Sequence, residues 1–258
     1  MRDRLPAIAL VTAILVAWEA YVRITGVAPV VLPAPSRIAT ALWDFRADAA
    51  RHALPTIIET VVGFLLAVGL AVTAAVAMDR VPFIRRAVEP ILVTSQTIPV
   101  VAIAPLFLLW FGFGLLPKIL IVMVVTFFPI VVALLDGFGS TSRDAADLLR
   151  SYGATDGQAF RKLRWPTALP AFFTGLRIAV VYAVIGAVFG EYVGAREGLG
   201  IWMLLSQNAF RTDLVFAAIL VTSAVSLVLY WVVGLVRRAT IPWAPGVRRE
   251  VDLEEQPF

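Results

Sequence analysis

The chain has no cysteine, a single histidine and few charges. Of its 258 residues, 16% are charged and 60% are hydrophobic, and the mean hydropathy is +0.88. The lack of cysteine excludes disulfide scaffolds, thiol nucleophiles and cysteine-type zinc sites, and His52 alone cannot form a paired-histidine metal site. We therefore predict no metal site and no cofactor on this chain. The high hydropathy excludes a water-soluble globular domain.

Catalytic motifs are also missing. The sequence contains no Gly-x4-Gly-Lys-Ser/Thr loop, so any energy source that depends on such an ATP-binding loop must be a partner. A Ser/His/Asp site would have to use His52, and nothing near this residue resembles a nucleophile elbow. We therefore predict no catalytic residues and interpret His52 as a polar residue at the membrane interface.

Long apolar runs dominate the sequence. A helix of about 20 apolar residues crosses the roughly 30 Å hydrocarbon layer of a bilayer. The runs therefore predict an all-α integral membrane protein, a single domain over 1–258 with six transmembrane helices. We expect these helices at residues 5–24, 54–78, 91–113, 117–136, 169–190 and 214–236, with a cytoplasmic loop at about 137–168. Gly112 and Gly114 divide the long third run into the third and fourth helices.

The distribution of positive charges sets the expected topology. With both termini in the cytoplasm, 15 of the 22 lysines and arginines lie in cytoplasmic segments and 7 in outer segments, in agreement with the positive-inside rule. An alternative is that Arg2, Arg4 and the apolar run after them form a secretory signal, but no small-residue cleavage pattern closes that run. We expect both termini to be cytoplasmic.

Polar residues inside the predicted spans are costly and need partners. Glu59 lies near the outer end of the second span and Glu191 ends the fifth span on the same side, and for both we favour a hydrogen bond over a substrate or proton role. Four polar residues open the third span beside Pro99: Thr94, Ser95, Gln96 and Thr97. They indicate either a helix end near the headgroups or the lining of a passage, and the sequence leaves both possibilities open.

The long loop at 137–168 has the pattern of a helix, a glycine break and a second helix. Thr141 or Ser142 can cap the first helix. Leu148, Leu149 and Tyr152 share one face of it, while Asp147 and Arg150 project elsewhere. At Gly153 the chain can turn or let another backbone come near. An apolar face beside a glycine suggests a surface that meets a partner, and the alternative is a peripheral loop without one.

Around this glycine the chain resembles the permease subunit of bacterial ATP-binding-cassette importers. That family carries a cytoplasmic motif of Glu-Ala-Ala, three residues, Gly, nine residues, Ile, any residue and Leu-Pro. With its glycine on Gly153, the glutamate falls on Asp147, the alanines on Leu148 and Leu149, the isoleucine on Leu163 and Leu-Pro on Trp165-Pro166.

Three further segments resemble the branch that moves nitrate, sulfonates, taurine and thiamine pyrimidine precursors. They are Leu32-Pro33-Ala34-Pro35-Ser36, the stretch from Gln96-Thr97-Ile98-Pro99 to Trp110-Phe111-Gly112-Phe113-Gly114, and Ala168-Leu169-Pro170 with Thr174-Gly175-Leu176-Arg177. The likeness covers nearly the full length of the chain.

The resemblance implies a type I importer permease fold in the bacterial inner membrane. In that family the loop forms a coupling helix that docks in a groove of a separate ATPase subunit, which carries the ATP and Mg²⁺. The implied coupling residues here are Asp147, Leu148, Leu149, Tyr152, Gly153, Ala154, Leu163 and Pro166. The resemblance also implies an extracytoplasmic substrate-binding protein and a second permease copy in a homodimer. The lipid bilayer is the remaining partner, and no nucleic acid is expected.

The substrate is less well defined by the sequence. The segments 190–200 and 210–219 resemble permeases for hydroxymethylpyrimidine-type thiamine precursors, although anion transporters share much of both. A pathway for an anion is expected to place Arg or Lys near the midplane, and the charge-free runs contain neither. This favours an uncharged aromatic heterocycle. The alternatives are a permease for sulfonate, taurine or nitrate, a channel or gradient-driven transporter, and an intramembrane enzyme.

Overall fold

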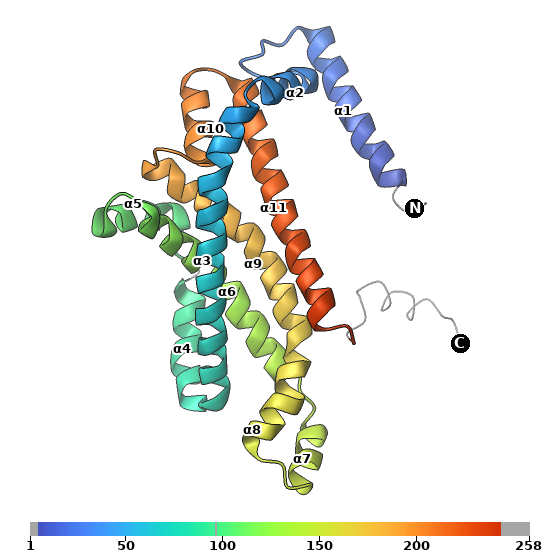
Figure 1. Ribbon diagram of the computed structural model, residues 1–258, viewed down its shortest axis with the longest axis vertical. Coiled ribbons are helices and arrows are strands. Elements are labelled where there is room, and N and C mark those ends of the chain that lie inside the picture. Colours follow the sequence, from blue (N-terminus) through green and yellow to red (C-terminus); the bar gives the residue numbers. More distant parts are fainter. Residues whose placement is uncertain (1–4, 96, 244–258) are drawn as a thin grey trace.

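The computed structural model describes residues 5–95 and 97–243, and every regular element in these residues is a helix (Figure 1). In chain order the elements are α1 (Leu5–Thr25), α2 (Pro35–Asp44), α3 (Arg46–Arg80), α4 (Pro82–Ser95), α5 (Val100–Phe111), α6 (Leu115–Gly139), α7 (Arg143–Ser151), α8 (Asp156–Ala159), the π-helical turn η2 (Phe160–Arg164), α9 (Trp165–Gly194), α10 (Leu199–Asn208) and α11 (Thr212–Thr240). Gln96 falls outside the described residues.

In the described part of the chain, five helical segments are long and apolar enough to cross a membrane. They are α1, α3, α6, the continuous run Asp156–Gly194 that ends in α9, and α11. The 35 residues of α3 extend roughly 52 Å at 1.5 Å per residue, so this helix is longer than a hydrocarbon layer is thick. Large apolar side chains such as Leu65, Leu66 and Leu227 are exposed on these helices, as expected for surfaces that face lipid.

The third predicted span is not one helix. Where the sequence predicted a single helix over 91–113, the chain forms α4 and α5, with a break before Pro99. Pro99 provides no N–H, and its ring disfavours helical geometry in the preceding residue. The 12 residues of α5 cover only about 18 Å and are too short to cross a bilayer. The prediction of one helix over 91–113 is therefore wrong.

The centre of the bundle is formed by α3, α6 and α9, which pack closely because small residues line their contacts. A Cβ atom on Gly63 of α3 would lie 2.6 Å from Val122 Cβ of α6, and one on Gly186 of α9 would lie 2.8 Å from Val125 Cγ2. Ala67 and Ala71 of α3 are fully buried. In a bilayer such close approach stabilises helix pairs mainly through van der Waals contact, since lipid tails are as apolar as the side chains they replace.

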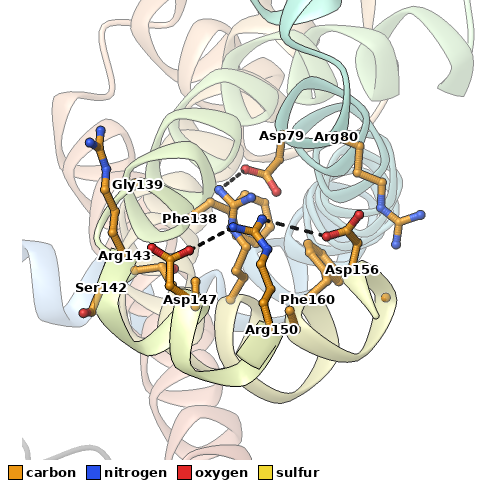
Figure 2. A pocket seen from close by; sticks show the side chains of 15 residues that line it. Asp79, Arg80, Phe138, Gly139, Ser142, Arg143, Asp147, Arg150, Asp156 and Phe160 are labelled. Carbon is orange, nitrogen blue, oxygen red and sulfur yellow. Dashed lines mark hydrogen bonds and ion pairs between the residues drawn. The ribbon is translucent and has the colours of Figure 1, made fainter. Parts of the chain in front are cut away.

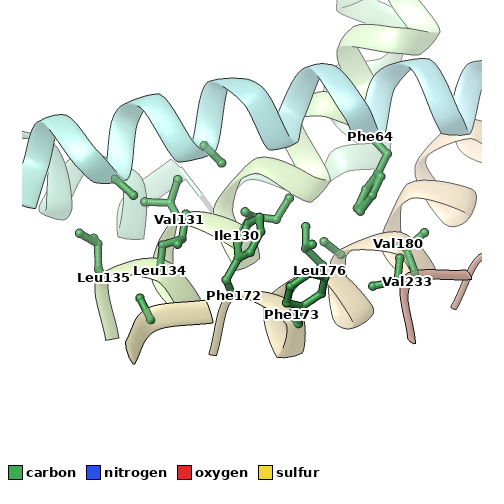
Figure 3. Close-up of a cluster of buried hydrophobic side chains, with 14 of the residues drawn as sticks. Phe64, Ile130, Val131, Leu134, Leu135, Phe172, Phe173, Leu176, Val180 and Val233 are labelled. Carbon is green, nitrogen blue, oxygen red and sulfur yellow. The ribbon is translucent and has the colours of Figure 1, made fainter. Parts of the chain in front are cut away.

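Large apolar side chains fill the space between these helices (Figure 3). The cluster includes Phe64, Ile130, Leu134, Phe172 and Phe173, each at most 9% exposed. Val233 of α11 closes the cluster from the side. The result is a closely packed three-helix centre from which the remaining elements extend at both ends.

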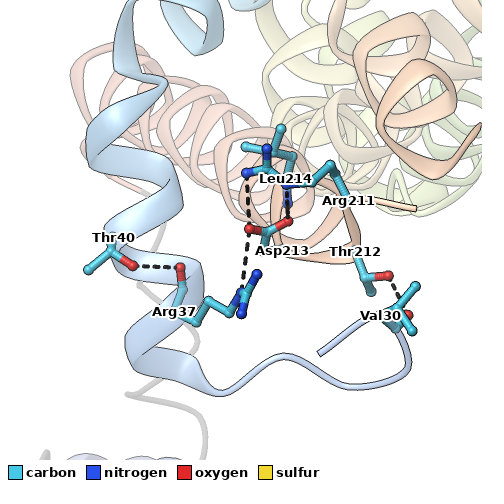
Figure 4. Close-up of polar contacts among 7 residues, drawn as sticks. All are labelled: Val30, Arg37, Thr40, Arg211, Thr212, Asp213 and Leu214. Atoms are coloured by element: carbon cyan, nitrogen blue, oxygen red, sulfur yellow. Dashed lines mark hydrogen bonds and ion pairs between the residues drawn. The ribbon is translucent and has the colours of Figure 1, made fainter. Parts of the chain in front are cut away.

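The two ends of the molecule differ in their elements. The short helices α7 and α8 lie at one end, here termed the α7 end, while α2 and α10 lie at the other, here termed the α10 end (Figure 1). At the α10 end, Asp213 pairs with Arg211 at 2.9 Å and with Arg37 of α2 at 3.6 Å, and Thr212 Oγ1 donates to the Val30 carbonyl (Figure 4). These contacts tie α2 to the start of α11.

Candidate functional site

The predicted pattern of helix, glycine and helix is confirmed at the α7 end. Ser142 Oγ accepts a hydrogen bond from the Ala145 amide at 3.3 Å and caps the start of α7. At its other end Gly153 has a φ of 80°, its amide donates to the Arg150 carbonyl at 2.9 Å, and the Ala154 amide donates to the Leu149 carbonyl at 3.1 Å. This is a Schellman turn, which needs the left-handed conformation that glycine adopts without strain.

The chain after Gly153 returns directly into the membrane bundle. Thr155 and Gln158 cap the start of α8 reciprocally, and α8 continues through η2 into α9. Leu163 lies in η2, and Pro166 follows this π-helical turn at the start of α9; both side chains are half-buried. The structure thus brings the predicted residues 147–154 together around one turn, whereas Leu163 and Pro166 lie on the next helix.

The two faces of α7 have different surroundings. Leu148 and Tyr152 are 58% and 81% exposed and Leu149 is half-buried, so the apolar face predicted from the sequence is open at two of its three side chains. The other face, with Arg143, Asp147 and Arg150, lines a cavity of about 840 Å³ between α7 and the ends of the bundle (Figure 2). Helix α7 is therefore held over a polar cavity, with its apolar side available to a partner.

Asp147 lies on the polar face and not on the apolar one. Its Oδ1 is 3.1 Å from Arg150 Nη1, and a second carboxylate, that of Asp156, lies 3.8 Å from Arg150 Nη2 (Figure 2). All three side chains are exposed, so these ion pairs are strongly screened by water. They orient the turn around Gly153 without holding it rigidly.

A second cavity, of about 930 Å³, lies between the break in the third predicted span and the helices α6 and α9. Its lining is mostly apolar and includes the aromatic side chains Phe107, Phe127, Phe128 and Tyr182. The polar groups are Ser95, Asp136, Thr174 and the Tyr182 hydroxyl. Among the described lining residues there is one acid and no lysine, arginine or histidine.

Of the four polar residues predicted near this break, only Ser95 is among the residues that line the cavity. Gln96 is outside the described residues. Thr94, Ser95 and Thr97 are exposed, and each hydroxyl donates to a backbone carbonyl three or four residues earlier, at 2.8–2.9 Å. Helix α4 ends at Ser95, so a helix end and a cavity wall coincide at this point.

At the α10 end the structure contains a buried polar network that the sequence revealed only in part. Lys118 Nζ donates to Glu59 Oε1 at 2.5 Å. Thr56 Oγ1 donates to Glu191 Oε1 at 2.5 Å, and the Gly200 amide donates to Glu191 Oε2 at 2.6 Å. The expected hydrogen bonds of Glu59 and Glu191 are therefore confirmed. Lys118, at the start of the fourth predicted span, is only 9% exposed, because it pairs with a residue of α3 that lies 59 positions earlier in the chain.

The loop between α9 and α10 is fastened to the first turns of α3. The Gly198 amide donates to His52 Nδ1 at 3.1 Å, and the imidazole stacks on the Trp202 ring at a centroid distance of 5.9 Å. Arg51 pairs with Glu197 at 2.5 Å and holds the pKa of that carboxyl below its usual range. Within residues 5–95 and 97–243, no three His, Asp or Glu side chains gather as a metal site would require.

Comparison with known proteins identifies the family. Residues 63–242 match the model of the binding-protein-dependent transport system inner membrane component family. The chain is 38% identical over 231 residues to the formylaminopyrimidine transport permease protein ThiX of Halalkalibacterium halodurans, covering 89% of this chain and 92% of the relative. It is 34% identical over 232 residues to the riboflavin transport system permease protein RibX of Chloroflexus aurantiacus, covering 89% and 87%.

Similarity to a solved structure supports the fold. A chain in an inward-facing crystal structure of the MetNI methionine ABC transporter superposes with a TM-score of 0.61 at 19% identity, covering 78% of this chain and 97% of that one. The family match spans more than half of the sequence and the relatives cover most of it. The chain belongs to the family of binding-protein-dependent transport system inner membrane components, and it is a multi-pass permease subunit of an ABC importer in a bacterial inner membrane.

Proposed function

We propose that this permease moves a small aromatic heterocycle, a pyrimidine precursor of thiamine or a related compound, through the 930 Å³ cavity. The observation that carries the proposal is the lining of that cavity, which combines four aromatic side chains with one carboxylate, that of Asp136, and no basic residue. A flat heterocycle can stack on the aromatic faces, and its amino groups can donate to Asp136 and to the hydroxyls.

The same lining is unfavourable for an anion. A sulfonate or nitrate group in a low-dielectric passage needs arginine, lysine or an equivalent set of donors to offset its desolvation. Asp136 would instead repel it. The named functions of the relatives agree with this preference, since permeases for formylaminopyrimidine and riboflavin are 38% and 34% identical, whereas a taurine permease of Escherichia coli is 26% identical.

The coupling role belongs to the α7 end in this proposal. Leu148, Leu149 and Tyr152 dock in a groove of the partner ATPase, and Gly153 lets the two backbones approach closely. Docking there makes the α7 end cytoplasmic and the α10 end the side that receives the substrate-binding protein. The support is the open apolar face of α7 and the tight turn that presents it.

A second copy of the chain completes the pathway. The cavity is bounded by α3, α4, α5, α6 and α9 on one side of this chain, and the partner copy supplies the facing wall. Thr94, Ser95 and Thr97 then lie at the break beside this passage. A homodimer with one ATPase per permease follows from this arrangement.

The direct test is transport in proteoliposomes. The tagged chain is isolated with the ATPase and the binding protein that accompany it, and uptake is measured with radiolabelled formylaminopyrimidine and with taurine. We expect uptake that depends on ATP for the pyrimidine alone. ATP-dependent uptake of taurine without uptake of the pyrimidine would contradict the proposal, and uptake that continues without the ATPase would favour a channel or gradient-driven transporter.

Asp136 provides a sharper test of the cavity. Asp136→Asn removes the charge that amino groups of the substrate would meet, so we expect KM for the pyrimidine to rise about tenfold, in line with the loss of one charge-assisted hydrogen bond. Asp44→Asn is a matched control, because Asp44 is exposed at the end of α2. An unchanged KM in the Asp136 variant would remove this residue from the pathway.

A further inference from the structure

The last turn of α3 is joined to the turn η2 by an ion pair with a buried carboxylate. Asp79 Oδ1 lies 2.7 Å from Arg164 Nη2, and the Asp79 and Arg164 side chains are 5% and 38% exposed. The next residue of α3, Arg80, places its guanidinium 5.1 Å from the centre of the Phe160 ring. Two consecutive residues of α3 thus contact the first and last residues of η2, and Asp79, Arg80 and Phe160 face one cavity (Figure 2).

This ion pair is made through a single contact. Asp79 Oδ2 and Arg164 Nε are both buried, and neither has a hydrogen-bond partner in the described part of the chain. A carboxylate and a guanidinium can form two parallel hydrogen bonds. A small rotation of η2 can therefore add the second contact without breaking the first, so the pair can persist while the angle between α3 and η2 changes.

The pair lies between helix α7, which makes few helix contacts, and the closely packed centre of the bundle. Helix α7 lies over a cavity, and among the helices it packs chiefly against α8, which continues into η2. On the other side α3 packs tightly on α6 through fully buried small residues, including Ala71 and Ala75. A π-helical turn such as η2 interrupts the regular hydrogen bonding of a helix and often marks a functional site.

We propose that Asp79 and Arg164 are positioning residues that carry the movement of α7 to α3, and through α3 to the wall of the 930 Å³ cavity. Leu70 lies on α3 two and a half turns before Asp79 and lines that cavity. This role rests on the proposed docking of the ATPase on α7. A pair with a buried carboxylate suits it, because separating the charges leaves one of them unpaired in a poorly solvated place.

The test uses the full complex of permease, ATPase and binding protein in proteoliposomes. The double variant Asp79→Asn/Arg164→Gln removes both charges and so leaves no lone buried ion. We expect the binding protein to stimulate ATP hydrolysis at close to the normal rate, while substrate imported per ATP falls about tenfold, within the usual range of coupling between sites. Arg23→Gln, which removes the pair of Arg23 with Glu19 on the distant helix α1, is the matched control.

A second readout is independent of the transported compound. Because the chain has no cysteine, Leu70→Cys introduces one thiol on this subunit at the cavity wall. We expect its maleimide labelling rate to differ between the nucleotide-free and vanadate-trapped complex, and the double variant to abolish that difference. Arg164→Lys, which keeps the charge but not the planar fork, should restore part of the difference when Asp79 is intact.

The role of the pair would be overturned if the double variant imported as much substrate per ATP as the parent complex, or if it kept the difference in maleimide labelling rate. It would also be overturned if the double variant failed to insert into the membrane, because the pair would then be structural only. Absence of any labelling difference in the parent complex would also overturn it, since α3 would then not move. A normal labelling response together with no pyrimidine uptake would contradict the proposed substrate instead, and loss of that response in the double variant would still support the positioning role.

Discussion

The buried network at the α10 end and the ion pairs around α7 treat their charged residues in opposite ways. At the α10 end, Glu59, Lys118 and Glu191 are at most 9% exposed and are joined across α3, α6 and α9 by short hydrogen bonds. At the α7 end, Asp147, Arg150 and Asp156 form exposed ion pairs, and the apolar side chains Leu148 and Tyr152 project outward. The network buries its charges within a single chain, whereas α7 leaves its ion pairs and these two apolar side chains exposed.

This difference predicts which substitutions change the stability of the chain and which change its coupling to the ATPase. Breaking a buried pair leaves an uncompensated charge, whereas an exposed pair exchanges readily with water. Substitutions at the α10 end are therefore expected to act on folding in the membrane, and those at the α7 end to act on the partner ATPase. The following predictions separate the two ends, and they run from the largest expected effect to the smallest.

Lys118→Met is expected to have the largest effect on stability. It leaves the Glu59 carboxylate buried without its partner, at a cost of about 3–5 kcal/mol. Thermal unfolding of the detergent-purified chain measures this as a lower Tm. The double variant Glu59→Gln/Lys118→Met should recover most of the loss, since no lone charge remains. A Tm equal to that of the parent chain in the single variant would refute the contrast between the ends.

Gly153→Asp is expected to abolish ATP-coupled uptake while the protein stays in the membrane. The added Cβ meets no atom within 4 Å, so the chain itself has room for it, but the φ of 80° strains any other residue by roughly 1–2 kcal/mol. The carboxylate also blocks the approach of another backbone. Gly157→Asp is the matched control, because Gly157 is equally open but has no positive φ. Normal uptake by a stably inserted Gly153→Asp variant would contradict the coupling role.

The pair Leu148→Ser and Tyr152→Ser tests the open face of α7. Burial of one such side chain in an interface contributes about 1.5–3 kcal/mol, so each substitution should weaken association with the ATPase roughly tenfold or more. Because both side chains are exposed in the isolated chain, its Tm should not change. Association is measured by recovery of the ATPase with the tagged chain. Leu205→Ser, an exposed apolar position on α10, should leave recovery unchanged.

Arg150→Gln should have the smallest effect. It removes the exposed ion pairs with Asp147 and Asp156, and exposed pairs contribute less than about 1 kcal/mol to stability. The difference in Tm between this variant and Lys118→Met measures how much more a buried ion pair contributes to stability than an exposed one. A loss of stability as large as that of the Lys118 variant would mean that α7 is part of the folded core.

The sequence predicts the membrane helices well where a single apolar run is uninterrupted. The runs behind α6 and α11 are found from hydropathy alone, since a long charge-free stretch has few other stable structures in a bilayer. It fails at 91–113, because apolar composition cannot tell a straight helix from two short ones separated by Pro99. The start of α9 was also predicted near Leu169, whereas the helix begins at Trp165 and continues from α8.

The residues of the candidate site also fall into a group that the sequence predicts and a group that it misses. Local signals found the α7 turn, because Ser142 and Gly153 act on their immediate neighbours through capping and backbone conformation. Lys118 and the pair of Asp79 with Arg164 were missed, since their partners are 59 and 85 positions away in the chain. Charges of that kind are identified only when the packing of the helices is known.

Helix α9 connects the two ends of the molecule directly. Its 30 residues extend roughly 45 Å, and it carries Trp165 beside η2 at one end and Glu191 in the buried network at the other. If the helix tilts as a stiff rod, a tilt of about 5° displaces one end by roughly 4 Å relative to the other, which exceeds the length of any hydrogen bond. A modest swing imposed beside η2 would therefore be enough to pull apart the polar contacts of Glu191 at the far end of the same rod.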